Sequence, residues 1–391
     1  MTEFAHQLLI TLDIGGTRAS GFGVPWPDGP AVPLEAPSKN LRAIDDIELG
    51  KLLSAIRDQM AEHGISQPAY WLIGAAGGRP DRDSARIARI LADLNLPTSG
   101  IEVYRDFEAN HSAAFGGEDG ILSVNGTGSV LYGRWKGREG RRAGWGYLLD
   151  ELPSAGAFGR WALQAILQLQ AGTPVSPIWE QLVSANLPPE LATSASLLDH
   201  IYASASPQKL LAGFGPLFSQ AWSENCPWSR ARVEASFDLW AVEMRHLADA
   251  LLLSLPSPLL LPHLAPISGT PLPASVLLPV PVPVPALPPL SALAPIPFSG
   301  LGALWKYWPG CITLSQAALT KTFPGKFAWR SPCFAPAWGP LLLHLKNVTS
   351  DAAAARTAVS RLADAKTPKF FQASIPSETS AAGPRPHAAN R

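Results

Sequence analysis

The chain has 391 residues, a formal net charge of zero and an ordinary hydrophobic content of 47%. This length allows two packed lobes, or one large α/β body divided by a cleft. No basic stripe appears, so the sequence does not favour a nucleic-acid-binding protein. The three cysteines, Cys226, Cys311 and Cys333, are far apart and lack C-x-x-C spacing. They are therefore interpreted as thiols and not as disulfides or a cluster site.

The N-terminal sequence MTEFAHQLLITLD contains an acid where a secretory signal needs basic residues, and its apolar run is short. We therefore expect a cytoplasmic protein. A later stretch without charges is interrupted by proline too often to give a membrane-spanning helix. The sequence thus predicts no membrane partner.

Strands and helices alternate along the first 250 residues, which is typical of the α/β class. A strand over HQLLITLD and a second strand over Ala19–Val24 form a predicted hairpin around Gly15–Gly16. Further strands are expected in AYWLIGAAGG, IEVYRD and ILSVNGTGSVLYGRW. The predicted helices cover Asp45–His63, Asp83–Leu94, Phe107–Phe115 and Ser154–Gln170.

The last third of the chain has a different composition. From Ala250 to Trp305 it contains no Asp, Glu, Lys or Arg, and prolines crowd it. Proline lacks an N–H donor and fixes φ, which excludes helix interiors and central strands where it is this frequent. We predict a first lobe over 1–110, the start of a second lobe over 111–254, and a poorly ordered tail over 255–391. A polyproline linker and a slipped reading frame are two open explanations of this tail.

The first motif that carries chemistry is Asp13-Ile14-Gly15-Gly16-Thr17 in the predicted hairpin. Glycines let backbone N–H groups approach phosphate oxygens, and the Thr17 hydroxyl adds a donor. A carboxylate at the end of the strand suits a magnesium ion held through water, which makes Asp13 the metal candidate. The motif is not a Walker loop, because a hairpin follows where that motif needs a helix. An ordinary glycine hairpin is the alternative interpretation.

A second glycine turn, Asn125-Gly126-Thr127-Gly128-Ser129, also lies between two predicted strands. Two such turns can face each other across a cleft and hold the phosphates of a nucleotide from both sides. The pair is more informative than either turn alone. Gly126, Thr127 and Gly128 are therefore the second set of phosphate-binding candidates.

Asp106 ends the strand IEVYRD and begins a predicted helix. A carboxylate in this place can accept the proton of an attacking hydroxyl during phosphoryl transfer. A helix N-cap is the alternative role, because aspartate often has it. Both roles are compatible with the sequence.

The segment Gly144-Trp145-Gly146 is followed by the acids Asp150 and Glu151. Glycines on both sides allow the Trp145 ring to lie against a ligand, and the acids offer acceptors for sugar hydroxyls. The alternative is a turn with a core tryptophan and an acidic helix start.

Taken together, DIGGTRAS, SKN at Ser38–Asn40, AAGG, YRD, NGTGS and GWGYLLDE occur in one order. This ordered set resembles the N-acetylglucosamine kinase and glucosamine kinase group. That group shares a family with the BadF/BadG/BcrA/BcrD ATPases and belongs to the sugar kinase/Hsp70/actin superfamily. The resemblance extends from about Leu8 to Leu253.

The resemblance implies two ribonuclease H-like lobes of the actin/hexokinase type, which close on ATP, Mg²⁺ and an amino sugar. It implies that Asp106 is the base acting on the sugar 6-hydroxyl. Asn40, Trp145 and Asp150 match positions that hold the sugar. Relatives are often dimers, so a homodimer is an open option.

Two departures from the family pattern affect these expectations. The usual GDEGSG is written LDELPSAG from Leu149, so that a glycine before the acids is lost. Family members also have a strand ending in Gly-Gly that receives the adenosine, whereas this chain offers LAPISGTPLP with Gly269 alone. We therefore expect an incomplete or disrupted second lobe.

Two other functions follow from these observations. A BadF-type ATPase would drive a partner enzyme and hold an iron–sulfur cluster, but no cysteine lies near the matched motifs. A non-catalytic remnant of the family is favoured by the proline-rich tail.

Overall fold

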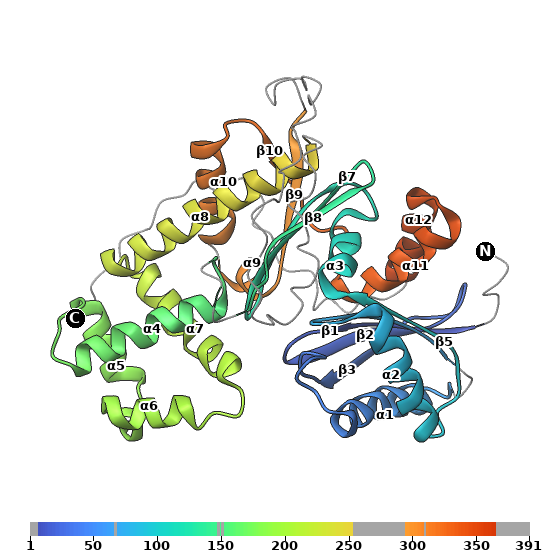
Figure 1. The fold of residues 1–391 in the computed structure, drawn as a ribbon, viewed down its shortest axis with the longest axis horizontal. Helices are drawn as coiled ribbons and strands as arrows, with labels where there is room; N and C mark the ends of the chain where they lie inside the picture. Colours follow the sequence, from blue (N-terminus) through green and yellow to red (C-terminus); the bar gives the residue numbers. More distant parts are fainter. Residues whose placement is uncertain are drawn as a thin grey trace, which may run out of the picture.

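The computed structural model describes residues 7–65, 69–146, 149, 152–252, 294–308 and 310–364. Within these residues two five-stranded sheets form the centres of two lobes, and helices cover them (Figure 1). The expected α/β class is therefore confirmed. In the same ranges, no helix combines the length and the apolar character needed to cross a bilayer.

The first sheet has the strand order β3-β2-β1-β4-β5. Its strands are β1 (Leu8–Ile14), β2 (Arg18–Pro25), β3 (Val32–Pro37), β4 (Ala69–Ala75) and β5 (Thr98–Arg105). β1 and β2 form the predicted antiparallel hairpin, while β1, β4 and β5 run parallel to one another. The carboxyl ends of these three parallel strands therefore meet at one edge of the sheet, where ligands of open α/β sheets bind.

Both faces of this sheet are covered by other elements. The side chains of β1 alternate between the two faces, and nearly all of them are buried. Leu8, Ile10, Leu12 and Ile14 pack with the apolar sides of α1 (Asp46–Glu62) and α2 (Pro80–Asp93). Residues that favour helix N-termini begin both helices. The Asp45 side chain accepts a hydrogen bond from the Glu48 N–H at 2.8 Å and so caps α1, and Pro80 occupies the first position of α2.

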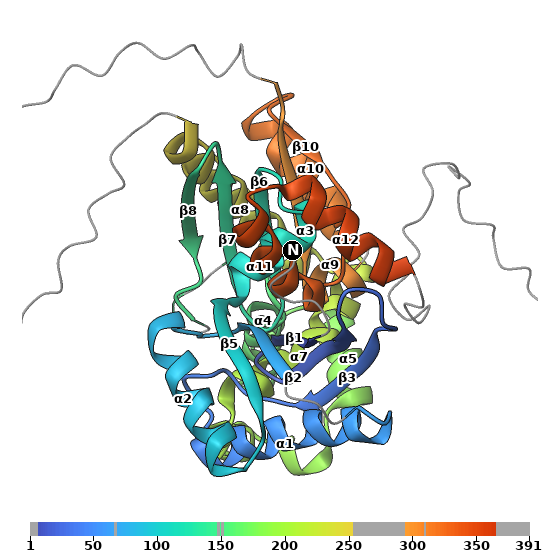
Figure 2. The same cartoon turned by 90° about the vertical axis from the view of Figure 1, so that its right-hand side faces the viewer.

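The opposite face is covered by the last two described helices, α11 (Gly339–Thr349) and α12 (Ala352–Asp364). Leu9 of β1 belongs to this second core, together with Trp338 and Leu341. Thr11, also on this face, donates from its hydroxyl to the Ala337 carbonyl at 2.6 Å. Figures 1 and 2 show α11 and α12 beside β1, far from α1 and α2.

The second sheet repeats the plan of the first, with the order β10-β9-β6-β7-β8. Its strands are β6 (Gly120–Asn125), β7 (Ser129–Trp135), β8 (Arg138–Ala143), β9 (Ile296–Leu301) and β10 (Phe327–Trp329). β6, β7 and β8 are antiparallel, whereas β6, β9 and β10 run parallel. β6 therefore has the place in its sheet that β1 has in the first one.

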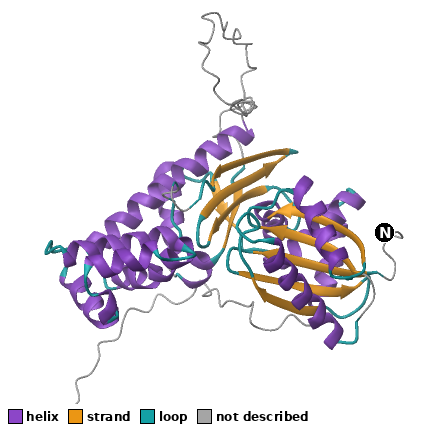
Figure 3. Ribbon diagram, turned by 60° about the horizontal axis from the view of Figure 1, so that its bottom comes forward, coloured by secondary structure: helices purple, strands orange, loops and turns teal. Residues whose placement is uncertain are grey.

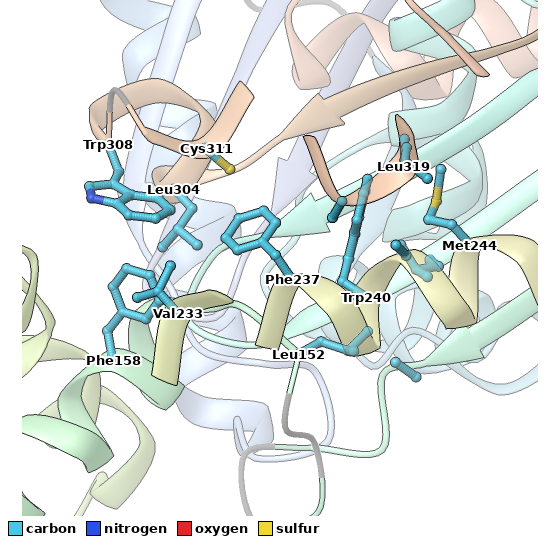
Figure 4. Close-up of a cluster of buried hydrophobic side chains, with 14 of the residues drawn as sticks. Leu152, Phe158, Val233, Phe237, Trp240, Met244, Leu304, Trp308, Cys311 and Leu319 are labelled. Carbon is cyan, nitrogen blue, oxygen red and sulfur yellow. The ribbon is translucent and has the colours of Figure 1, made fainter. Parts of the chain in front are cut away.

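Helices α4 to α8 connect β8 to the later part of the sheet, and Figure 3 shows them as a largely helical extension of the second lobe. The remaining helices are α3 (Asp106–Phe115), α4 (Ala155–Gln170), α5 (Pro177–Asn186), α6 (Ser194–Tyr202), α7 (Pro207–Ser223), α8 (Pro227–Leu252), α9 (Ala303–Tyr307) and α10 (Gly310–Thr322). Short 3₁₀ turns cover Pro189–Leu191 and Pro336–Trp338. Phe158, Phe237, Trp240 and Trp308 build the core between these helices and β9 (Figure 4).

The expectation of a poorly ordered tail from residue 255 onward is wrong for residues 294–308 and 310–364. β9 lies between β6 and β10, and α11 and α12 complete the first lobe. Pro297 is tolerated in β9 because pairing with β6 begins only at Phe298. The scarcity of acids in α11 reflects burial, since its first seven residues are all buried. The parts of the tail at 253–293 and 365–391 lie outside the described residues, as does the proposed frame slip there.

We propose that the described residues within 7–105 and 334–364 form the first lobe, that those within 120–330 form the second, and that α3 crosses between them.

The packing of α11 on α3 gives a stability prediction. A Cβ at Gly339 would lie 2.1 Å from the Ala109 carbonyl oxygen, so Gly339→Ala forces α11 away from α3. We expect a loss of about 1–3 kcal/mol in the free energy of unfolding, measured in urea. Gly213→Ala on α7 is the control: a Cβ there meets nothing within 4 Å, and a gain of up to about 1 kcal/mol is expected. Equal stability of the two variants would contradict the α3–α11 packing.

Candidate active site

The first glycine turn closes the β1–β2 hairpin. The Gly15 N–H donates to the Arg18 carbonyl at 2.9 Å, and the Ser38 hydroxyl donates to the Gly15 carbonyl at 2.8 Å. Gly16 and Thr17 are exposed at the tip. A Cβ at Gly16 would meet no atom within 4 Å, so the outer side of the turn has room for a ligand.

The second glycine turn joins β6 to β7 in the corresponding place of the other lobe. The Gly126 N–H donates to the Gly128 carbonyl at 2.9 Å. The start of α4 supports the turn from behind: the N–H groups of Ala155 and Gly156 donate to the carbonyls of Gly126 and Thr127 at 2.9 and 3.0 Å. A Cβ at Gly126 would meet nothing within 4 Å, so this turn is also open on its outer side.

A third glycine turn, which the sequence analysis missed, follows β9. Gly302 has φ +103° and lies against the second turn, since a Cβ there would be 2.7 Å from the Asn125 carbonyl. Trp305 donates from its indole N–H to the Asn125 side-chain oxygen at 2.7 Å. The expected Gly269 lies outside the described residues. The sequence pattern that could have predicted this turn is IPFSGLG, an apolar segment that ends in glycines at 300 and 302. It was overlooked because it lies within the charge-free, proline-rich stretch.

Asp13 and Asp106 form the acidic centre of the site. Asp13 precedes the last residue of β1, and Asp106 follows β5 directly. Burial and the neighbouring charge of Asp106 raise the pKa of the Asp13 carboxyl to about 7. Burial also raises the pKa of Asp106, against the lowering effect of two backbone hydrogen bonds and the Arg141 charge. The two carboxylates therefore influence each other electrostatically at the carboxyl edge of the first sheet.

Asp106 does not have the alternative role of helix N-cap. The N-cap of α3 is Arg105, and the Glu108 side chain accepts from the Arg105 N–H at 3.3 Å. Asp106 is instead the first helical residue, and it is partly buried.

Asn40 lies at the same edge. Its side-chain oxygen accepts from the Arg42 N–H at 2.9 Å, and the Leu41 N–H donates to the Ala76 carbonyl at 2.9 Å. A Cβ at Gly77 would come within 2.1 Å of this Asn40 oxygen. The loop that carries Asn40 is thus attached to the end of β4, beside the first glycine turn.

Trp145 is 65% exposed, so the alternative interpretation as a core residue is wrong. Gly144 and Gly146 on either side have φ values of +73° and +104°. The Arg141 guanidinium lies 5.0 Å from the centroid of the Trp145 ring. Asp150 and Glu151 lie outside the described residues, so the expectation that they lie near the sugar stays a prediction.

Comparison with known proteins gives a partial sequence match and a match of the whole fold. Over 151 residues, or 38% of this chain, the sequence is 28% identical to an N-acetylmuramic acid/N-acetylglucosamine kinase of Clostridium acetobutylicum. The matched region is 48% of that protein, so the chain spans about half the length of the curated relative it matches. No family model matches the chain.

Two solved structures share the fold. A candidate N-acetylglucosamine kinase from Chromobacterium violaceum superimposes with a TM-score of 0.60 and 17% identity, over 87% of this chain and 99% of that one. A candidate N-acetylglucosamine kinase from Porphyromonas gingivalis gives a TM-score of 0.58 and 18% identity, over 88% and 100% of the two chains. The resemblance to N-acetylglucosamine kinases and the expected two-lobed fold of that group are therefore confirmed.

The raised pKa of Asp13 predicts a pH dependence of stability. The folded protein keeps this proton up to about pH 7, whereas the unfolded chain loses it near 3.8. The stability that this proton contributes is fully present below the pKa of Asp13 in the unfolded chain, 3.8. It is lost as the pH rises to the pKa of Asp13 in the folded protein, about 7. In urea with EDTA, the stability of Asp13→Asn relative to wild type should therefore rise between about pH 4 and pH 7. Parallel pH profiles of the two proteins would exclude a buried Asp13 carboxylate.

Proposed function

We propose that the chain transfers the terminal phosphoryl group of ATP to the 6-hydroxyl of an amino sugar, N-acetylglucosamine or glucosamine. The observation that carries this proposal is the arrangement at the two sheets. Each sheet presents an open glycine turn after its first strand, and Asp106 follows the parallel strand β5. Phosphoryl transfer depends mainly on positioning and on charge stabilisation, which this arrangement provides.

The two turns have the role of a phosphate clamp in this proposal. Backbone N–H groups at Gly15, Gly16 and Thr17 would contact the phosphates from the first lobe, and those at Gly126, Thr127 and Gly128 from the second. The open outer sides at Gly16 and Gly126 leave room for close approach. The turn at Gly302, in contact with Asn125, is the adenosine side of the same site.

A magnesium ion fits the acidic centre. Asp13 and Asp106 are neighbouring, partly buried carboxylates whose like charges repel each other, and a hard divalent cation relieves this repulsion through oxygen ligands. We propose that Asp13 holds the ion through water. The ion would neutralise charge on the phosphate oxygens when it is bound.

Asp106 is the proposed catalytic base. Its carboxylate accepts the proton of the sugar 6-hydroxyl while that oxygen forms a bond to the γ-phosphorus of ATP. The bond between the γ-phosphorus and the bridging oxygen of ADP breaks, and ADP leaves. We propose that Asn40, Trp145 and Asp150 hold the sugar. Asn40 comes from the first lobe and Trp145 from the second, so that the sugar would be bound as the lobes approach.

The two alternatives are less well supported. A cluster-dependent ATPase would need exposed cysteines near the site, but Cys226 and Cys311 are buried in the second lobe. The third cysteine, Cys333, lies where its N–H donates to the Ala114 carbonyl at the far end of α3. A non-catalytic remnant was favoured by the proline-rich tail, but residues 294–308 within that tail form β9 and the Gly302 turn, which we propose as the adenosine side. We propose that the chain acts in the cytoplasm, either as a monomer or as a homodimer.

The clamp can be tested at Gly126. Gly126→Ala adds a methyl group on the open side of the turn, where no protein atom lies within 4 Å. We expect an unchanged melting temperature and a KM for ATP raised about tenfold, because the methyl group occupies space needed by a phosphate. Steady-state kinetics and calorimetry measure the two quantities. Gly213→Ala in α7, where an added Cβ also meets no atom within 4 Å, should leave the KM unchanged. The same KM in both variants would refute the clamp.

The base can be tested with Asp106→Asn. This change removes the proton acceptor and keeps the shape of the side chain, so kcat should fall by about 10²–10⁴. Binding of N-acetylglucosamine, measured by calorimetry, should be retained. Asp58→Asn, at an exposed acid of α1, is the control and should keep most of the activity. Substantial phosphoryl transfer by Asp106→Asn would show that the base assignment is wrong.

A further inference from the structure

Arg141 connects the two lobes next to the proposed active site. It lies in β8, the edge strand of the second sheet, opposite Tyr132 of β7. Its guanidinium carbon lies 5.0 Å from the centroid of the Trp145 ring and 5.7 Å from the centroid of the Phe107 ring. Phe107 follows Asp106 at the start of α3, whereas Trp145 follows β8. One cation therefore contacts both the aromatic ring beside the sugar and the start of the helix that carries the base.

The contact with Phe107 is held in place by further packing. The Phe107 ring lies 5.0 Å from the Tyr132 ring, and Tyr132 lies 5.3 Å from His111, one helical turn further along α3. α3 is thus fixed against β7 next to Arg141. The Arg141 charge also lowers the pKa of Asp106, against burial and the Glu108 charge, which both raise it.

The contact with Trp145 is important because this ring is 65% exposed. Trp145 also stands between Gly144 and Gly146, which have positive φ and lack side chains that could restrict the neighbouring chain. A cation over the face of an aromatic ring limits the orientation of that ring, and arginine makes this contact more often than lysine. The broad planar guanidinium faces both rings here, whereas the ammonium of lysine is a compact point charge on a flexible stem.

We propose that Arg141 is a positioning residue, which orients Trp145 toward the sugar and holds the charged start of α3 beside it. This proposal rests on the proposed function, because it assigns Trp145 and Asp106 the roles given above. Arg141 makes two contributions in it. The contact with Trp145 orients that ring and governs sugar binding, while the contact with Phe107 holds the start of α3 in place and governs turnover.

Two substitutions test these contributions. Arg141→Lys keeps a cation but replaces the broad guanidinium by a compact ammonium, so the KM for N-acetylglucosamine should rise about two- to fivefold with little change in kcat. Arg141→Gln removes the cation from both rings, so the KM should rise further and kcat should fall as well. The control is Arg142→Gln on the next residue of β8, whose guanidinium lies 3.9 Å from Glu243 of α8. This control should change neither quantity.

A measurement without turnover completes the test. Tryptophan fluorescence of the ligand-free protein, with Trp145→Phe subtracted as reference, reports the Trp145 environment. Arg141→Lys should shift this signal, and Arg142→Gln should not. If both Arg141 variants match Arg142→Gln in kinetics and fluorescence, the proposal is overturned. If wild-type protein phosphorylates neither amino sugar, the proposed function fails, and the fluorescence shift still decides whether Arg141 orients Trp145.

Discussion

Burial of both faces of the first sheet is the constraint on which the rest of the structure depends. β1 places Leu8 and Ile10 on one face and Leu9 and Thr11 on the other. The neighbouring helices α1 and α2 cover only the first face. The second face has to be covered by a distant part of the chain, so α11 returns from the second lobe and packs on α3 and β1. This return connects the lobes and fixes the helix that begins with Asp106.

The local parts of this architecture could be predicted from the sequence. Alternating apolar residues and glycine pairs predicted the β1–β2 and β6–β7 hairpins, and Asp106 was correctly placed between a strand and a helix. Those signals are short-range, since each depends on residues within one turn or strand. The resemblance to sugar kinases added the two-lobed arrangement, which the comparisons confirm.

The parts that could not be predicted depend on long-range contacts. β9 looked unsuitable for a strand because of Pro297, and only its pairing register shows why that proline is tolerated. Similarly, the first seven residues of α11 lack the charges of a surface helix because all of them are buried, with Leu341 packed in the same core as Leu9 of β1. Arg141 is one of several arginines in the sequence, and its place between Phe107 and Trp145 follows from the fold alone.

Phosphorus-31 NMR of the wild-type chain with ATP, Mg²⁺ and N-acetylglucosamine or glucosamine is the decisive measurement for the proposed kinase activity. We expect a sugar 6-phosphate and ADP to appear together, and ATP to stay intact when the sugar is left out. Release of inorganic phosphate without the sugar would contradict the proposed kinase activity and favour an ATPase. Persistence of ATP with both sugars would favour a non-catalytic protein.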